Sequence, residues 1–600
     1  MILTKFQATY LTVFIFYMLF VPTSNFGIYA SVSSILSKSW RKIDNGTTSN
    51  DYNSTKYIKK QINYVFYTFQ KVTDLVENFY YMTDVIDAIE ETEYIVSNKL
   101  AEVKKMKEIR EYKSMIMSRY KTVEQYYENI STLETSTLLS FAESTVFSLD
   151  TISLREYVQK IHYSLFGAED EENKAAKSFE ELAINFKSSN DRSCRKQQSA
   201  QQYLYSFYND IVRTELKGII LLDFSWMILR VLGKGNFTAQ ANLAKRQHQE
   251  RMKRTVRYLR KALSTSDRVI WQCDPSEHIE ATTYASINKP VEPYYRYVPE
   301  GYSCTSTHFC GEPPTCNGTI NSCKERKSDR TITVTIKGKD VHSTTITPCI
   351  LCACTCELKG NEYKGDCLFS LRTSVADVKN NMVVTGLRLR KIQRMFYIQI
   401  QQGKLLPRGT IDSSTLEWLP LDIINLNTAE KNIDYFELTS WSRGLQLDNV
   451  GTELISFVVT GVRIIISSKT DMVLDVGFNE FNFETGKLLS TDEVSMWRNR
   501  VPCNLKVLNA WGKSSPSPSK SFPQSTARSF IKFELDNRIP LVDLQDVVSN
   551  PPVPLEGAGF YYKYRYGYGG HVALKLFTLN LNNYPLPDLS KKNDELINTY

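Results

Sequence analysis

The densest group of reactive side chains in the sequence is the stretch PCILCACTCEL at residues 348–358. Its cysteines are Cys349, Cys352, Cys354 and Cys356. Thiolates bind zinc, exchange disulfides in a C-x-x-C motif or form structural disulfides. His308 and His342 are within reach in sequence, but the second cysteine pair of a usual zinc site is missing. A redox C-x-x-C needs a helix start, whereas this stretch has a strand pattern. We favour disulfides and keep zinc and redox chemistry as alternatives.

The cysteine count agrees with a disulfide framework. The chain has 12 cysteines, an even number, of which ten lie between Cys273 and Cys367. On a strand, the residues at 352, 354 and 356 share one face, so each must reach another segment. The candidate disulfide residues are Cys194, Cys273, Cys304, Cys310, Cys316, Cys323, Cys349, Cys352, Cys354, Cys356, Cys367 and Cys503. Cys194 could pair with Cys273, and we expect the row on 348–358 to staple the junction between two domains.

The N-terminus indicates the compartment. Residues 1–30 combine Lys5 with a short apolar run, Tyr10 to Val21, and a small residue at Ala30. This pattern predicts a secretory signal peptide, because a bilayer span needs about 20 apolar residues. A signal anchor is the alternative, and both place the chain outside the cell. The sequons expected to carry glycans are at Asn45, Asn53, Asn129, Asn236 and Asn317.

The elements that must position these residues change along the chain. No proline occurs between Pro22 and Pro275, and apolar residues recur every three or four positions. This predicts a helical domain over residues 31–267, because proline interrupts helices. Cysteine, proline and glycine gather in residues 268–370, which predicts a loop-rich disulfide region. Residues 371–600 alternate in polarity and predict a β-rich domain.

An internal repeat lies in the β-rich domain. VVTGLRL at 383–389 matches VVTGVRI at 458–464, and a GKLL tetrad follows each. We read residues 383–406 and 458–489 as two copies of one β unit. Gly386 and Gly461 are suited to a bulge or bend within each copy.

Two helices of the N-terminal domain need separate interpretation. Leu216–Gly235 is apolar nearly all round and is interrupted only by Asp223 and Arg230 at its centre. We interpret it as a central helix buried by its neighbours, with membrane insertion as the alternative.

The next helix, Leu243–Leu263, is strongly basic. A solvated helix face is the plain interpretation, and a strip that binds anionic glycans or a membrane surface is the functional one. The residues of this possible anion-binding strip are Lys245, Arg246, Arg251, Lys253, Arg254, Arg257, Arg260 and Lys261.

Enzyme signatures are not found in the sequence. The histidines are His162, His248, His278, His308, His342 and His571, and none lies in an H-E-x-x-H motif. We therefore expect no catalytic residues, no metal and no cofactor. Near the C-terminus, tyrosines at positions 561–568 alternate with Lys563 and Arg565. They suit a sugar-stacking face or an ordinary cross-strand ladder.

The β region carries a family resemblance. VVTGVRI followed by LDVGFNEFNFETGKL, within residues 458–488, resembles a family of secreted insect proteins classed only as a domain of unknown function. The resemblance implies a signal peptide, a helical N-terminal half, a cysteine-bearing middle and a β-rich C-terminal half. It implies no activity and no site residues.

Together these features predict a multidomain α+β protein. It should comprise an N-terminal helical bundle, a Cys-rich disulfide-stapled middle and a C-terminal antiparallel β-sandwich-like domain. The first functional hypothesis is a secreted, non-catalytic binding glycoprotein for an extracellular protein or glycan, with possible peripheral membrane contact. The alternatives are a pore-forming protein and an unrecognised hydrolase. The net charge of +8 is mild for 600 residues and gives no reason to expect nucleic acid as a partner. The sequence makes no prediction of oligomeric state.

Overall fold

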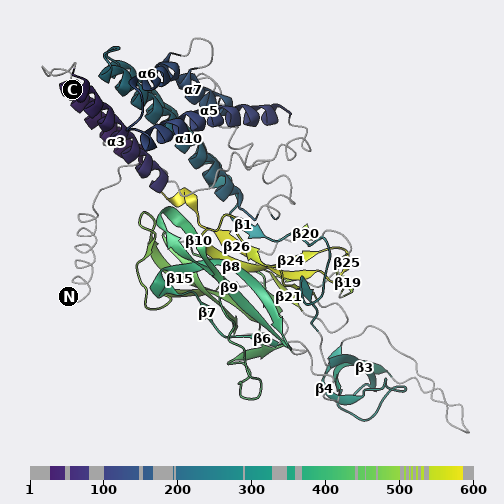
Figure 1. Cartoon of the computed structure of the whole chain (residues 1–600). Helices are drawn as coiled ribbons and strands as arrows, with labels where there is room; N and C mark the ends of the chain where they lie inside the picture. The colour runs from purple at the N-terminus through teal and green to yellow at the C-terminus, as the bar shows by residue number, and fades with distance from the viewer. Residues whose placement is uncertain are drawn as a thin grey trace, which may run out of the picture. The chain divides into compact units, whose positions relative to one another are not determined.

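The structure is a computed structural model of the 600-residue chain (Figure 1). It describes residues 28–46, 54–79, 100–147, 153–166, 194, 197–287, 291–326, 348–358, 368–438, 444–452, 454–467, 471–499, 506–508, 512–513, 515–517, 522–523, 529–532 and 540–584. The apolar run of the predicted signal peptide, the sequon at Asn53, and Cys367 and Cys503 lie outside the described residues. The fold is α+β, as predicted, with helices toward the N-terminus, disulfides in the middle and sheets toward the C-terminus.

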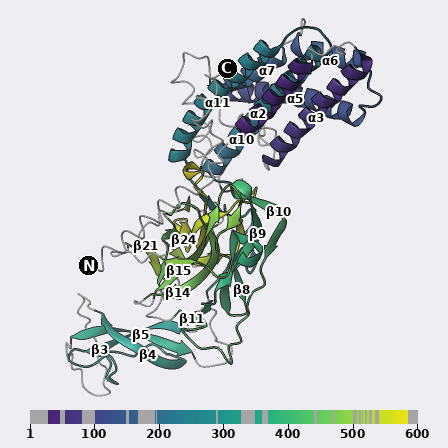
Figure 2. The same cartoon turned by 90° about the vertical axis from the view of Figure 1, so that its left-hand side faces the viewer.

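The chain divides into two compact units. Unit 1 comprises residues 1–184, 203–266 and 584–600, and unit 2 comprises residues 185–202 and 267–583. The helices within the described residues are α2 (Ile28–Gly46), α3 (Thr55–Phe79), α5 (Leu100–Glu128), α6 (Thr135–Val146), α7 (Leu154–Phe166), α10 (Ala200–Val231) and α11 (Thr238–Thr265). Figures 1 and 2 show them packed side by side as a bundle.

Helix α10 runs through the centre of the bundle. Its residues are buried on every side from Leu216 to Leu229, as expected for a helix that is apolar all round. It ends at Val231, four residues before the predicted end, because Gly233 adopts a left-handed conformation with φ of 71°. The backbone N–H of Gly233 then donates to the carbonyl of Arg230, which closes the last turn.

The start of α2 bears on the predicted signal peptide. Ile28 and Tyr29 are 3% and 8% exposed, and the Tyr29 hydroxyl donates to the carbonyl of Lys245 at 3.1 Å. The Tyr29 ring also contacts His248, with 5.0 Å between the ring centroids. Cleavage after Ala30 would remove both side chains from the core of the bundle.

Unit 2 is built mainly from packed sheets. One sheet contains β13 (Asn449–Gly451), β24 (Leu555–Tyr564), β26 (His571–Thr578), β22 (Leu541–Asp543), β2 (Tyr284–Ala285), β1 (Val269–Trp271) and β20 (Phe522–Pro523). A second contains β11 (Tyr435–Glu437), β6 (Leu368–Ser370), β9 (Met395–Leu406), β8 (Met382–Ile392), β23 (Val547–Val548) and β10 (Thr410–Trp418).

A third sheet contains β18 (Lys506–Leu508), β21 (Ser529–Lys532), β12 (Gly444–Gln446), β15 (Met472–Asn482), β14 (Phe457–Ile466), β7 (Ser374–Val375), β16 (Lys487–Leu488) and β17 (Met496–Asn499). Most strand pairs in the three sheets are antiparallel, and their inward side chains form one continuous apolar core. A short pair, β19 (Gly512–Lys513) with β25 (Gly567–Tyr568), adds to unit 2.

The repeated sequence forms the same hairpin twice. Strand β8 pairs with β9, and β14 pairs with β15, each with a register shift just before the repeated glycine, Gly386 or Gly461. A Cβ at Gly386 would lie 2.6 Å from Val548 of the next strand, so the glycine also allows a close strand approach. The GKLL tetrads are not equivalent, because Gly403 lies within β9 whereas Gly486 occupies a turn with φ of 65°.

The cysteine-rich segment folds into a small sheet of its own. We call it the cysteine sheet: β5 (Cys349–Leu358) lies between β3 (Val291–Pro299) and β4 (Gly318–Arg326), antiparallel to both. Its core consists of Tyr294, Val298 and half-cystines. A module this small buries little apolar surface, so covalent bridges replace much of the missing core.

Candidate functional site

Every described cysteine of the chain is half of a disulfide. The pairs are Cys194–Cys273, Cys304–Cys352, Cys310–Cys349, Cys316–Cys356 and Cys323–Cys354. The cysteines at 352, 354 and 356 share the buried face of β5, as the strand period predicts. Bonded sulfurs do not offer the thiolates that zinc binding or redox exchange would need.

One expectation about these cysteines is wrong. The row on β5 does not staple two domains, because all four of its partners lie at residues 304–323, in the connection from β3 to β4 or in β4 itself. The longer link is Cys194–Cys273, which closes a sequence separation of 79 residues. It holds the residues before α10 against the segment that follows β1, both within unit 2.

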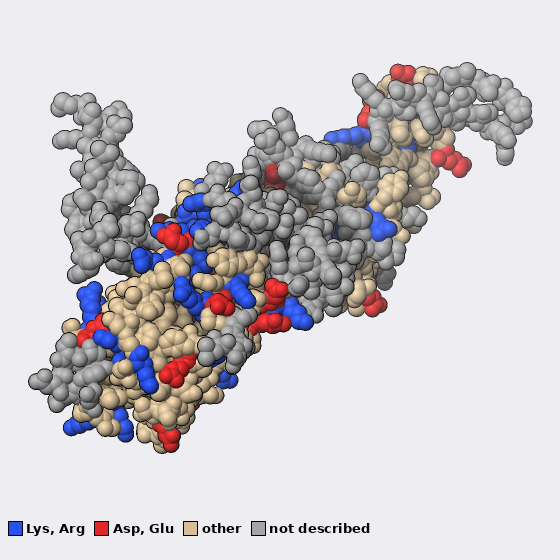
Figure 3. Space-filling model, turned by 90° about the horizontal axis from the view of Figure 1, so that it is seen from above, with Lys and Arg blue, Asp and Glu red and all other residues tan. Residues whose placement is uncertain are grey.

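The structure divides the predicted basic strip on α11 into two sets. Arg246, Lys253, Arg257, Arg260 and Lys261 are exposed and recur at helical spacing along one side, and Arg254 is half-buried. We call the five exposed residues the α11 strip. From Arg246 to Lys261 the strip rises by 15 residue steps, or roughly 22 Å at 1.5 Å per residue. In Figure 3, Lys and Arg are interspersed with Asp and Glu over the face shown.

Lys245 and Arg251 do not belong to the strip, which corrects the sequence interpretation. Lys245 is buried 3.6 Å from the Asp223 carboxylate, and Arg251 is buried 3.3 Å from Glu215. Both lie on the side of α11 that also carries Met252 and faces α10. The sequence pattern shows charge but not the acids of α10 that draw these two cations inside.

The acids of α10 are neutralised within the bundle. The buried Glu215 carboxylate also lies 3.3 Å from His248 Nδ1. Burial alone would raise the pKa of Glu215, but Arg251 and His248 hold it below its ordinary value. For Asp223, burial dominates and raises the pKa, although Lys245 and a hydrogen bond from Trp40 Nε1 at 2.8 Å oppose it. In the part of the chain that the structure describes, no helix has the length and apolarity to span a bilayer.

The predicted glycosylation sites are placed as follows. The sequons at Asn45, Asn129, Asn236 and Asn317 all lie at exposed positions. Asn129 follows the end of α5, Asn236 precedes α11, and Asn317 precedes β4. Exposure is the condition that glycan attachment requires.

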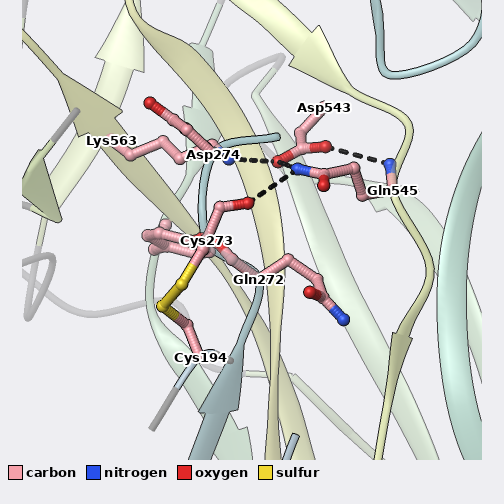
Figure 4. The surroundings of a disulfide bond; sticks show 8 residues. Cys194, Gln272, Cys273, Asp274, Asp543, Gln545 and Lys563 are labelled. Carbon is pink, nitrogen blue, oxygen red and sulfur yellow. Dashed lines mark hydrogen bonds and ion pairs between the residues drawn. A yellow bond between two sulfur atoms is a disulfide. The ribbon is translucent and has the colours of Figure 1, made fainter. Parts of the chain in front are cut away.

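A second group of charges lies in unit 2, beside the disulfide that joins Cys194 and Cys273. Lys563 of β24 is 2% exposed, and its ammonium lies 2.9 Å from Asp274 and 2.5 Å from Asp543. Figure 4 shows the three side chains pointing toward one another. Burial opposes the charge on Lys563, but Asp543, Tyr561 and Asp274 outweigh it and raise the lysine pKa.

The backbone around Asp274 is held by side chains of unit 2. The side-chain Nε2 of Gln545 donates to the carbonyl of Cys273 at 3.0 Å. The backbone N–H of Gln545 donates to the Asp543 carboxylate at 2.9 Å (Figure 4). The Tyr561 hydroxyl donates to the carbonyl of Gln272 at 3.2 Å. The residues just before Asp274 are therefore fixed by a disulfide and by hydrogen bonds to the carbonyls of Gln272 and Cys273.

Two histidines complete this group. His571, the first residue of β26, is 1% exposed, and the His278 ring stacks on it with 5.2 Å between centroids. Asp274, His278 and His571 each offer one metal-binding atom, and these atoms all lie within 4.8 Å of one another. We call Asp274, His278, His571, Asp543 and Lys563 the His–Asp cluster.

Part of the sequence matches a known protein family. Residues 191–300 and 335–400 match a family model. The matching family is the domain of unknown function DUF4803. The DUF4803 match agrees with the resemblance to an uncharacterised family. It includes residues 383–400 of the first copy of the β repeat and does not include residues 458–488. No curated protein matches the sequence.

The sequence analysis missed the His–Asp cluster. Asp274 and His278 are four residues apart directly after Cys273, within the DUF4803 match, and this spacing was an available signal. His571 and Lys563 lie outside the match, on the tyrosine-rich hairpin of β24 and β26. Pairing of distant strands brings them together, and no local motif records that.

Proposed function

We propose that this protein is a secreted, non-catalytic binding glycoprotein that takes an anionic glycan along the α11 strip. The observation that carries the proposal is the row of exposed cations on one side of α11. A linear polyanion can contact several cations of such a row at once. The electrostatic field of the cations also concentrates anions near this surface. The disulfides and the exposed sequons support an oxidising, extracellular setting.

A soluble glycan suits the strip better than a bilayer. An interfacial helix buries an exposed apolar face among lipids. The apolar residues Met252, Val256, Leu259 and Leu263 of α11 are all turned inward and buried. Leu243, near the start of α11, is 40% exposed, but a single leucine is far less than the continuous apolar face that membrane insertion uses.

The buried start of α2 refines the secretion proposal. Because Ile28 and Tyr29 pack in the bundle, we place the signal-peptide cleavage site before Ile28 rather than after Ala30. N-terminal sequencing of the secreted protein tests this directly. A mature chain that begins at Ser31 would contradict it.

The glycan proposal is tested with a sulfated polysaccharide such as heparin and the purified full chain. The variant Lys253→Gln/Arg257→Gln/Arg260→Gln removes three charges from the strip. Its matched control, Lys56→Gln/Lys59→Gln/Lys60→Gln, removes three exposed charges from α3 in the same unit. At roughly 0.5 kcal/mol for each exposed ion pair, we expect the strip variant to bind about 10-fold more weakly. The control should bind like wild type.

Two results would contradict the glycan proposal. One is equal weakening by both triple variants, which would show a nonspecific charge effect. The other is binding to vesicles with anionic lipid, with leakage of their contents, in the absence of heparin binding. That result would favour the membrane-active alternative instead.

A further inference from the structure

We propose that Asp274, His278 and His571 bind a divalent transition-metal ion, with zinc as the preferred ion. These residues come from two parts of the chain, the segment between β1 and β2 and the start of β26. Their metal-binding atoms lie within 4.8 Å of one another. Two imidazoles with one carboxylate form a ligand set that binds zinc and leaves a fourth position for water.

The state of His571 is the main support for the site. The side chain is 1% exposed, and neither ring nitrogen has a hydrogen-bond partner among the described residues. His278 Nε2 is also buried without such a partner. Buried polar atoms are nearly always hydrogen-bonded, so three imidazole nitrogens left over in one place need an explanation. A metal ion shared by the two rings provides one.

The protonation of His571 agrees with metal binding. Burial lowers the pKa of this imidazole to about 4, and the nearby Lys563 lowers it further, against the opposing effect of Asp543 and Asp274. His571 is therefore neutral at pH 7 and keeps a nitrogen lone pair for a metal. Metal ions bind the neutral form of histidine, so no proton has to be removed first.

The charge of the cluster also favours a cation, although Lys563 lies within it. Asp274 and Asp543 carry two negative charges and Lys563 carries one positive charge, which leaves −1 for these three side chains. Lys563 contacts one oxygen of Asp274, and a carboxylate has a second oxygen to offer. A divalent ion therefore enters a group with a net negative charge.

The ligand chemistry selects the class of metal. Imidazole nitrogens suit zinc, copper and nickel, whereas calcium and magnesium prefer oxygen ligands. Ligand atoms around tetrahedral zinc lie about 3.3 Å apart, given bonds of about 2.0 Å. The ligand atoms of Asp274, His278 and His571 lie within 4.8 Å of one another, so each distance between them must shorten by at most about 1.5 Å when zinc binds. His278 is only half-buried, so its ring can move and it provides access from solvent.

The test measures zinc binding to the chelator-treated, purified full chain. We expect isothermal titration with zinc chloride to give one ion per chain, and zinc to raise the thermal unfolding temperature. His278→Gln and Asp274→Asn each remove one ligand. Loss of partners that merely orient ligands weakens metal sites 10- to 100-fold, so these variants should bind at least about 100-fold more weakly. His308→Gln, at an exposed histidine of the cysteine sheet, is the matched control and should bind like wild type.

A cobalt titration provides a second readout that does not depend on folding stability. Cobalt bound by two imidazoles and a carboxylate should give a visible absorption band in wild type and in His308→Gln but not in His278→Gln. The proposal is overturned if wild type binds no zinc, or if His278→Gln and Asp274→Asn bind it as tightly as wild type. Circular dichroism confirms that the variants are folded, and the half-buried position of His278 makes it the safer substitution.

Discussion

Two buried groups of charges, one in each compact unit, differ in which of their atoms have no hydrogen-bond partner among the described residues. Around α10 these include one oxygen each of Glu215 and Asp223, acids that already lie beside a cation, whereas in the His–Asp cluster they include both ring nitrogens of one histidine. Around α10, Glu215 contacts Arg251 and His248, and Asp223 contacts Lys245, so each acid has a cation beside it. In the His–Asp cluster, Lys563 is shared by two acids, and His571 keeps two ring nitrogens without a partner in the described residues.

The difference separates a structural network from a binding site. Buried ion pairs occur in many proteins and add little net stability, although loss of one partner is costly. The α10 network fits that description. A buried group with spare metal-binding atoms has a cost that its own contacts do not offset, and a ligand can offset it. A buried charged group is therefore a weaker indicator of a binding site than buried metal-binding atoms that have no partner.

The largest expected effect comes from breaking the α10 network. Glu215→Gln leaves Arg251 buried without its counter-charge, which should lower the free energy of unfolding by about 3–5 kcal/mol. Glu250→Gln on α11 is the control, because Glu250 is 62% exposed and should change stability by less than about 0.5 kcal/mol. Urea unfolding followed by circular dichroism measures both. A loss below 1 kcal/mol for Glu215→Gln would contradict the importance of this pair.

The next effect concerns the anchor of the His–Asp cluster. Cys194→Ser/Cys273→Ser opens a loop of 79 residues and should cost about 2–4 kcal/mol. It should also weaken zinc binding, because the segment with Asp274 and His278 loses its covalent anchor. Cys310→Ser/Cys349→Ser opens a bridge in the cysteine sheet and should reduce stability without a change in zinc affinity. Equal zinc affinities in the two double variants would contradict the anchoring role.

A smaller effect is a loss of stability in acid. The pKa of His571 is about 4, against about 6.5 in an unfolded chain, mainly because burial disfavours the imidazolium. Between these values the unfolded state binds more protons, so stability is full above pH 6.5 and falls as the pH drops toward 4. At pH 5 this histidine should cost about 2 kcal/mol.

The same arithmetic applies to His162 of the bundle, whose pKa burial also lowers to about 4. The effect of zinc on acid stability distinguishes His571 of the His–Asp cluster from His162 of the bundle. Protons must displace a bound metal, so saturating zinc should steepen the acid loss in wild type and in His162→Gln but not in His571→Gln. Urea unfolding between pH 7 and 5, with and without zinc, measures these slopes. A zinc effect that survives in His571→Gln would place the metal elsewhere.

The sequence predicted the features that depend on short-range periodicity. The missing prolines and the three-to-four spacing predicted the bundle, and alternation predicted that Cys352, Cys354 and Cys356 share one face. The repeated glycines Gly386 and Gly461 predicted bends that the structure shows as register shifts. Each of these is a local property of the backbone.

Features that depend on contact partners were not predictable in this way. The charges of Lys245 and Arg251 suggested exposed positions. Both side chains are buried instead, because each pairs with an acid of α10. The cluster around His571 is assembled from segments near residues 274, 543 and 571, which the pairing of β1 and β22 with β26 brings together. Strands that pair over long sequence separations leave no characteristic residue spacing from which the pairing could be predicted.

The smallest expected effect on stability separates the buried and exposed lysines of α11. Lys253 is 47% exposed and pairs with Glu250 on the surface at 3.3 Å, so Lys253→Gln should change the free energy of unfolding by less than about 0.5 kcal/mol. Lys245→Gln should cost several times more, because Asp223 stays buried with its cation removed. Heparin affinity should show the reverse order, with Lys253→Gln binding more weakly and Lys245→Gln, where folded, binding like wild type. Weaker heparin binding by Lys245→Gln alone would show that the glycan contacts the inward side of α11, against the division of the helix into a structural face and a binding face.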